Sequence, residues 1–244
     1  MNSYYSNIYW HFTGSPKNID WTKIYSPKGI LKHGKPKSDR ECLTILSKIF
    51  SSKKLIASTK EKVDKHIISE SFCCVTDIPI QNLGEHKKYY GNVAIGFKHS
   101  KIHRFFNPVF YISKRQLPHR FKRDEDLSQD EKISLFLKSK IRKSLFKRKS
   151  GSLSSLMNQG ITVDETKIGP FLLNYFKISD FSENMDNTFY REREWRKVGD
   201  FEFEVNDIAA IIVPEKTLTR SQKIMAKYNL SNIPLLTWEL LKKI

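Results

Sequence analysis

The chain has 244 residues and a formal net charge of +17, with 39% hydrophobic and 12% aromatic residues. This composition excludes a disordered chain, and the length allows one large domain or two small ones. No apolar run approaches the ~20 residues that span a bilayer, and no apolar signal core follows the N-terminus. We therefore expect a cytoplasmic protein with no membrane partner. Its positive charge, interleaved with aromatic residues, favours nucleic acid as the partner.

Cysteine and acidic residues give no sign of a disulfide framework or a metal centre. The three cysteines are Cys42, Cys73 and Cys74, an odd number with one adjacent pair. That pattern fits neither a set of disulfides nor a zinc site. The acidic and histidine residues show no metal-ligand spacing, so we expect no metal and disfavour a metal-dependent nuclease.

The N-terminal part predicts a strand followed by a capped helix. Residues 8–13 are aromatic and β-branched and predict a strand that ends at Gly14. His11 and Thr13 would share one face of this strand, where a lone histidine is typical of a satisfied core residue. Residues 17–37 predict a helical turn and a loop.

A capping box of Ser38 and Glu41 precedes apolar residues at helical spacing, which predict a helix that ends at 51–54. Residues 57–70 are polar and predict a surface connection.

The middle of the chain predicts strands separated by one helix. Residues 72–76 predict a buried strand, and Pro79 suits the first position of a helix over 80–89. Gly91 suits the left-handed residue past its end. Further strands are predicted at 93–97 and 109–112, with a break at Asn107 and Pro108 between them.

Residues 114–149 are the most basic segment, with thirteen Lys and Arg against five Asp and Glu. Ser128 and Glu131 form a second capping box before an amphipathic helix pattern. A solvated amphipathic helix explains the apolar stripe, whereas attraction to phosphates explains why nearly all charges beyond residue 131 have one sign.

The C-terminal part returns to strands and helices. Residues 171–176 predict a strand or a short helix, and 207–213 predict a buried strand. A helix follows from about residue 219, and 234–241 predict a short strand and a terminal helix. No repeat and no domain boundary is visible, so we predict a single domain over 1–244.

Residues 190–197 concentrate charge around two carboxylates. If they form a strand, Glu192, Glu194 and Arg196 share one face, opposite Arg193, Trp195 and Lys197. Carboxylates about 7 Å apart along a strand repel each other. The pair therefore benefits folding only if a cation or a reaction uses it. Spacing alone favours a mixed-charge ladder on an exposed edge strand.

Five elements, taken in order, resemble the AbiGi-type abortive-infection proteins of bacterial phage defence, a family labelled as antitoxin-like. They are His11–Gly14, Cys73–Pro79, His86–Gly91, Asn107–Val109 and Glu192–Arg196. The likeness covers about residues 8–213, and its most specific element is the last. At the level of fold, the layout is similar to ADP-ribosyltransferases, including DarT-like toxins that modify nucleic acid. This resemblance implies an α+β fold with a split β-sheet core, flanking helices and a basic helical insertion at about 114–150.

The same resemblance implies an NAD site. His11 and Thr13, with Phe12 between them, would hold the nicotinamide ribose and the neighbouring phosphate. Tyr90, or else Tyr89, would stack on the nicotinamide ring, and Thr76 is a third candidate for that middle position.

By the same likeness, Glu194 would be the catalytic carboxylate, and Glu192 would orient or deprotonate the acceptor. The chemistry suits these residues, because cleavage of the nicotinamide–ribose bond builds positive charge that a carboxylate stabilises. A second carboxylate can act as the general base.

The sequence therefore supports three hypotheses. The first is a phage-defence ADP-ribosyltransferase that moves ADP-ribose from NAD to a nucleic acid, RNA rather than DNA, and that an acidic antitoxin or chaperone restrains. The second is a non-catalytic antitoxin or nucleic-acid-binding component, in which Arg193 or Arg196 forms ion pairs with the glutamates. The third is NAD hydrolysis without a macromolecular acceptor.

Overall fold

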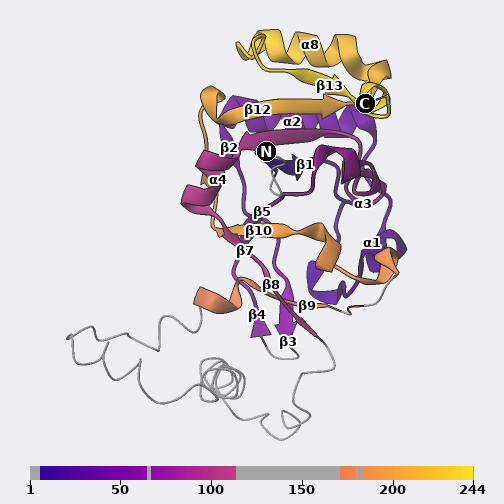
Figure 1. Cartoon of the computed structure of the whole chain (residues 1–244), viewed down its shortest axis with the longest axis vertical. Helices are drawn as coiled ribbons and strands as arrows, with labels where there is room; N and C mark the ends of the chain where they lie inside the picture. The colour runs from indigo at the N-terminus through magenta and orange to yellow at the C-terminus, as the bar shows by residue number, and fades with distance from the viewer. Residues whose placement is uncertain (1–5, 65–66, 114–170, 180, 182–183, 244) are drawn as a thin grey trace, which may run out of the picture.

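The computed structural model describes residues 6–64, 67–113, 171–179, 181 and 184–243 (Figure 1). Its strands are β1 (Ile8–Phe12), β2 (Lys54–Leu55), β3 (Lys62–Asp64), β4 (Ile67–Ile68), β5 (Phe72–Thr76), β6 (Ala94–Lys98), β7 (Asn107–Pro108), β8 (Phe110–Ser113), β9 (Phe176–Ser179), β10 (Glu194–Val198), β11 (Phe201–Glu202), β12 (Ile208–Val213) and β13 (Leu235–Thr237). Its α-helices are α1 (Pro27–His33), α2 (Asp39–Ser52), α3 (Lys87–Tyr90), α4 (His99–Phe105), α8 (Leu218–Lys227) and α9 (Trp238–Leu241). Its 3-10 helices are η1 (Trp21–Lys23), η2 (Ile80–Glu85), η5 (Met185–Asn187), η6 (Tyr190–Glu192), η7 (Val205–Asp207) and η8 (Glu215–Thr217). The basic insertion predicted at 114–150 lies outside the described residues.

A seven-stranded mixed sheet organises the described part of the chain, in the order β13-β12-β6-β1-β5-β10-β7. Only its β12–β13 pair is parallel, and the other neighbours are antiparallel. Figure 1 shows α8 over the β12–β13 end, whereas the pairs β3–β4 and β8–β9 extend from the opposite end. The predicted α+β class is confirmed.

Apolar side chains cover both faces of this sheet, because successive residues of a strand point to opposite sides. Tyr9 belongs to a large core that includes Leu43 and Leu46 of α2. Its neighbour Trp10 belongs to a second core with Ile212 and Trp238. Both cores are buried and close-packed, so they hold the strands of the sheet in place.

The sequence located most of these elements. The predicted strands at 8–13, 72–76, 93–97 and 207–213 and the final strand and helix are confirmed. The helix predicted after residue 38 is also confirmed, because Ser38 and Glu41 form the reciprocal hydrogen bonds of a capping box at the start of α2.

Three local predictions are wrong. The helix predicted over 80–89 is a 3-10 helix followed by the single turn α3, since Gly84 and its polar neighbours favour an α-helix weakly. The polar stretch 57–70 contains the small pair β3–β4 rather than only a surface connection. Asn107 and Pro108, predicted as a break, pair with β10 as an edge strand, where proline is tolerated.

The sheet opens between β1 and β5. These strands share one registered pair, Trp10 with Thr76, whereas β1 and β6 pair over their full length. The ring of His11 crosses the gap, and its Nδ1 donates a hydrogen bond of 2.9 Å to the Cys74 carbonyl. Beyond that pair, β1 and β5 leave a space between them. The side chains of residues 11–13, 74 and 76 line this space.

Two glycines hold the end of β1 against the end of α3. The Gly14 amide donates to the Tyr90 carbonyl at 2.9 Å. A Cβ on Gly14 would lie 2.6 Å from both the Gly91 Cα and the Tyr90 carbonyl oxygen, so only glycine permits this approach. Gly91 itself has φ +84°, as its predicted place after a helix requires. The contact brings Thr13 and Tyr90 to one site.

Candidate functional site

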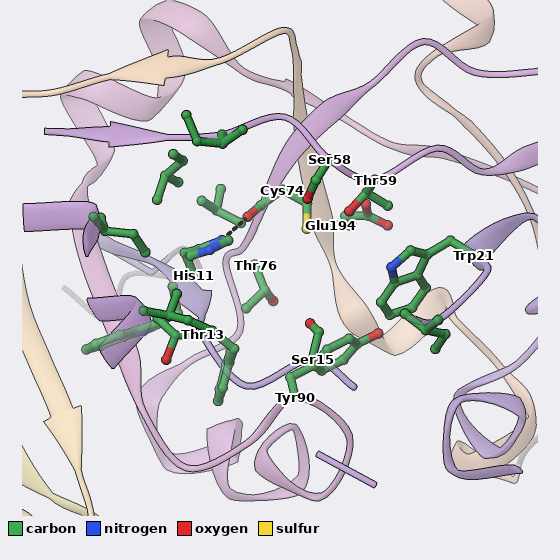
Figure 2. A pocket seen from close by; sticks show the side chains of 18 of the residues that line it. His11, Thr13, Ser15, Trp21, Ser58, Thr59, Cys74, Thr76, Tyr90 and Glu194 are labelled. Carbon is green, nitrogen blue, oxygen red and sulfur yellow. Dashed lines mark hydrogen bonds between the residues drawn. The ribbon is translucent and has the colours of Figure 1, made fainter. Parts of the chain in front are cut away.

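A cavity of about 670 Å³ lies where β1 and β5 separate (Figure 2). Its lining includes most of the residues that the sequence nominated: His11, Phe12, Thr13, Thr76, Tyr90, Glu192 and Glu194. The N-terminal strand and the late acidic doublet, which are far apart in the chain, therefore meet in one cavity. Tyr89 does not line it, because its hydroxyl donates to Asp186 outside the cavity.

The acidic doublet is positioned by a turn rather than by a continuous strand. Residues 190–192 form η6, and β10 begins at Glu194. Arg193 between them adopts the left-handed conformation at φ 45°, which is uncommon for a residue with a side chain. Its guanidinium binds Asp77 at 2.6 and 3.1 Å, and this bidentate pair stabilises the turn. Residues 190–197, considered above as if they formed a strand, are therefore a strand only from Glu194 onward.

Backbone hydrogen bonds fix both glutamates further. Thr76 donates its hydroxyl to the Glu192 carbonyl at 2.5 Å, and the Glu194 amide donates to the Tyr111 hydroxyl at 3.0 Å. On the opposite face of β10, Trp195 packs against Tyr9 in the large core. Both carboxylates consequently stay on the cavity side.

Lys177 of β9 lies at the centre of the acidic groups. Its Nζ is 2.8 Å from Glu194 Oε2, 3.0 Å from Glu192 Oε2 and 3.1 Å from Glu61 Oε1. Arg196 completes this carboxylate cluster, with Nε 2.7 Å from Glu194 Oε1 and a terminal nitrogen bound to Glu61. We use the name carboxylate cluster for these five residues.

Burial and charge act in opposite directions on the two glutamates. Burial alone would raise both pKa values. For Glu194, the cations Arg196 and Lys177 outweigh burial and lower the pKa to about 2. For Glu192, burial prevails over the attraction of Lys177, and Glu194 adds repulsion, so the pKa is raised. Glu194 is therefore a permanent anion, whereas Glu192 is the group of the doublet that takes a proton more readily.

Every oxygen of the doublet already accepts a hydrogen bond. Glu194 receives Arg196 and Lys177, and Glu192 receives Lys177 on one oxygen and the Tyr90 hydroxyl on the other. Burial, followed by the charge of Glu192, raises the pKa of Tyr90 well above its usual value, so the phenol keeps its proton. The carboxylates are thus engaged before any ligand arrives.

The β1 side of the cavity is neutral. Burial lowers the pKa of His11, and its bond to Cys74 fixes the proton on Nδ1, which leaves Nε2 as an acceptor. The Thr13 hydroxyl is shared between the carbonyls of Cys42 and Val93 at 3.2 and 3.3 Å. Thr13 therefore serves the backbone, and Nε2 of His11 is an acceptor on this side of the cavity.

Aromatic rings form another wall. Trp21 and Tyr90 both line the cavity, with their planes 17° apart and their centroids 6.3 Å apart. The ring centroid of His86 lies 5.4 Å from that of Tyr90. Burial lowers the pKa of His86 to about 4. These rings offer flat surfaces next to the carboxylates.

Sequence reasoning missed Lys177, Glu61, Trp21 and His86 as site residues. Lys177 pairs with the doublet directly, whereas Glu61 joins it through Lys177 and Arg196. No local motif indicates these contacts. Trp21 and His86 belong to stretches that the sequence did mark as helical, but nothing in their spacing points to the cavity.

Residues 45–239 match the family described as "Putative abortive phage resistance protein AbiGi, antitoxin". The chain belongs to the AbiGi family. Comparison with curated proteins and with solved structures finds no match. The AbiGi resemblance is thus confirmed, and the further likeness to DarT-type ADP-ribosyltransferases stays a prediction.

Two further findings concern only the described residues. None of their helices combines the length and the apolar character needed to cross a membrane. They also contain no cluster of three or more His, Cys, Asp or Glu side chains suited to a metal ion.

Proposed function

We propose that this AbiGi protein is the antitoxin-type component of an abortive-infection system and acts by binding a protein toxin, without catalysis. The observation that carries the proposal is that Glu192 and Glu194 both already form ion pairs within the protein. Lys177 pairs with both carboxylates that a transferase would present to its substrate, and Arg196 pairs with that of Glu194. The family description, an antitoxin, supports the same function.

The ion pairs also match what a non-catalytic component requires. A buried carboxylate that stabilises a developing positive charge loses much of that effect when two cations already compensate it. Glu194 Oε2 lies 2.8 Å from Lys177 and 3.1 Å from Arg196. The doublet then holds β9 and β10 together, and the protein surface does the binding.

Growth rescue tests this function. The full chain is co-expressed with the toxin of its own system, and growth is compared for wild type and Glu194→Gln. We expect wild type to restore growth and the folded Glu194→Gln variant to restore it equally, because binding does not use this carboxylate. Failure of wild type to bind the toxin or to restore growth would contradict the proposal.

One observation favours a second candidate, transfer of ADP-ribose from NAD to nucleic acid. His11, Tyr90, Glu192 and Glu194 line one cavity, as that activity requires. In this case Lys177 would have to move away from Glu194 when NAD binds. Incorporation of label from NAD into RNA that Glu194→Gln abolishes would favour this candidate over the first.

A further inference from the structure

Helix α4 presents a polar, basic surface that the proposed function does not use. Its exposed side chains, which we call the α4 surface, are those of His99, Ser100, His103, Arg104 and Phe105. Residues 86–113 contain no Asp or Glu, so α4 and its neighbours in the chain bring no negative charge to this surface. Within the described residues, the carboxylate in ion-pair contact with α4 is that of Asp207, which binds Lys101 at 2.9 Å.

Arg104 offers its charge to a ligand at the centre of this surface. Its side chain is exposed and forms no ion pair within the described part of the chain. Its Cζ lies 5.6 Å from the ring centroid of Phe105. Successive residues of an α-helix point about 100° apart, so the rings of His103 and Phe105 flank the guanidinium on either side. A cation between two aromatic rings therefore faces solvent.

The ring of His103 is exposed but held in one orientation. It lies parallel to Trp195, with 8° between the ring planes and 5.0 Å between the centroids. Its Nε2 is 2.6 Å from the hydroxyl of Tyr9. Burial raises the pKa of Tyr9 to about 12, so the phenol keeps its proton and donates this hydrogen bond. Because Tyr9 is 1% exposed and packs edge-on against Trp195, the support of the imidazole is itself fixed.

This combination of groups suits one class of ligand. A side chain that is already oriented loses little conformational entropy when it binds a flat group. Surfaces that bind single-stranded nucleic acid combine aromatic side chains, on which bases stack, with cations that bind phosphates. His103, Arg104 and Phe105 supply both kinds of group in three successive residues. An acidic protein surface would pair with Arg104 but would not by itself require the two rings.

The α4 surface is separate from the cavity between β1 and β5. Among the described residues that line the cavity, none belongs to α4, and Trp195 is not one of them. Glu194 and Trp195 are successive residues of β10, so their side chains point to opposite sides of the sheet. In Figure 1, α4 lies at the left, whereas α1 and α3 lie at the right. A ligand on α4 therefore leaves the two glutamates in their ion pairs.

We propose that the α4 surface binds single-stranded nucleic acid, with bases stacked on the rings of His103 and Phe105 and a phosphate bound by Arg104. The bases of a duplex are stacked on one another and cannot reach the two rings, so the ligand is a single strand. This binding goes beyond the antitoxin function and does not depend on the toxin. The net charge of +17 attracts the same ligand over a longer range.

Fluorescence anisotropy of labelled oligonucleotides with the full chain tests the stacking. One probe is an oligouridylate of about 12 nucleotides, within the range that such surfaces cover, and the other is its duplex with oligoadenylate. His103→Ala should weaken binding of the single strand at least about fivefold and leave binding of the duplex unchanged. The control His33→Ala removes an exposed histidine of α1 and should change neither. An equal loss for both probes, no loss for the single strand, or no binding of the single strand by wild type would overturn the proposal.

Arg104→Gln tests the phosphate contact. The slope of log affinity against log salt concentration should become shallower by about 0.7, as expected for one phosphate of a single strand. The control Arg220→Gln removes the same charge from an exposed position on α8 and should leave the slope unchanged. Equal effects of the two variants would show that net charge alone attracts the probe, which would overturn the proposal. Circular dichroism verifies that each variant is folded.

The same variants distinguish nucleic acid from a protein partner. We expect His103→Ala and Arg104→Gln to bind the purified toxin of the same system as tightly as wild type does. Loss of toxin affinity with unchanged oligonucleotide binding would assign the α4 surface to the protein interface and overturn the proposal. Comparison of oligouridylate with oligothymidylate then separates RNA from DNA, and a His103-dependent affinity for either strand supports the proposal.

Discussion

Lys177 Nζ lies 2.8 Å from Glu194 Oε2, in a place where both side chains are less than a tenth exposed. Glu192 and Glu61 surround the same ammonium, and their charges hold the pKa of Lys177 well above its usual value although burial opposes them. These ion pairs make Lys177 a structural centre of the site rather than a surface residue. They also engage the carboxylates of the acidic doublet, which are then less available to a substrate.

Removal of this ammonium should lower the free energy of unfolding strongly. Lys177→Met leaves three carboxylates with one cation, and the loss of one partner of a buried ion pair costs about 3–5 kcal/mol. Urea unfolding followed by circular dichroism measures the loss. The control Lys88→Met breaks an exposed pair with Asp186 and should leave the unfolding midpoint nearly unchanged. Equal midpoints for the two variants would contradict the central place of Lys177.

The two glutamates should respond to pH in opposite ways. The folded-state pKa of Glu194 is about 2, below its ordinary value of 4.5, because Arg196 and Lys177 outweigh burial. Its contribution to stability is therefore complete above about pH 4.5 and disappears as the pH falls toward 2. Glu194→Gln should cost on the order of 3 kcal/mol at pH 7 and progressively less in acid.

Glu192 has a raised pKa, so its ionised form opposes folding once the pH exceeds its ordinary value. Glu192→Gln should be as stable as wild type at pH 7, or more stable. Denaturant titrations of wild type and both variants from pH 7 to pH 3 measure these trends. The pKa assignment would be contradicted if Glu192→Gln were less stable than wild type at pH 7 and this difference became smaller in acid, as we predict for Glu194→Gln.

The contact of Gly14 with Gly91 should tolerate no side chain. In Gly14→Ala, the new methyl group would lie 2.6 Å from backbone atoms of Tyr90 and Gly91, which cannot move aside as a flexible side chain can. We expect a loss of several kcal/mol by analogy with overpacked cores. Gly84→Ala is the matched control, since a Cβ there meets nothing within 4 Å. Thermal melts compare the two, and equal melting temperatures would argue against a fixed approach of β1 to α3.

The sequence predicted the sheet better than it predicted the site. Strands such as 208–213 are marked by β-branched and apolar residues and by a following proline, all of which act locally. Glu192 and Glu194 were expected on one face because strand side chains alternate. They do lie together, but a 3-10 turn and the left-handed Arg193 bring them there.

Long-range charge pairs escaped prediction for a physical reason. Lys177 stands in a short alternating stretch that resembles any edge strand, and Glu61 stands in a polar segment that resembles a surface connection. Only the fold brings them within 3.1 Å of each other. Arg196, by contrast, was named as an ion-pair partner of the glutamates, and its bond to Glu194 confirms that prediction, whereas Arg193 binds Asp77 instead.

The most direct test of a binding function is transfer of label from NAD. The full chain is incubated with NAD labelled in its adenylate part and with RNA, alongside Glu194→Gln, and incorporated label is counted. We predict that wild type incorporates no more label than the variant, because the carboxylate of Glu194 is already ion-paired with Lys177 and Arg196. Incorporation by wild type that disappears in folded Glu194→Gln would contradict the account.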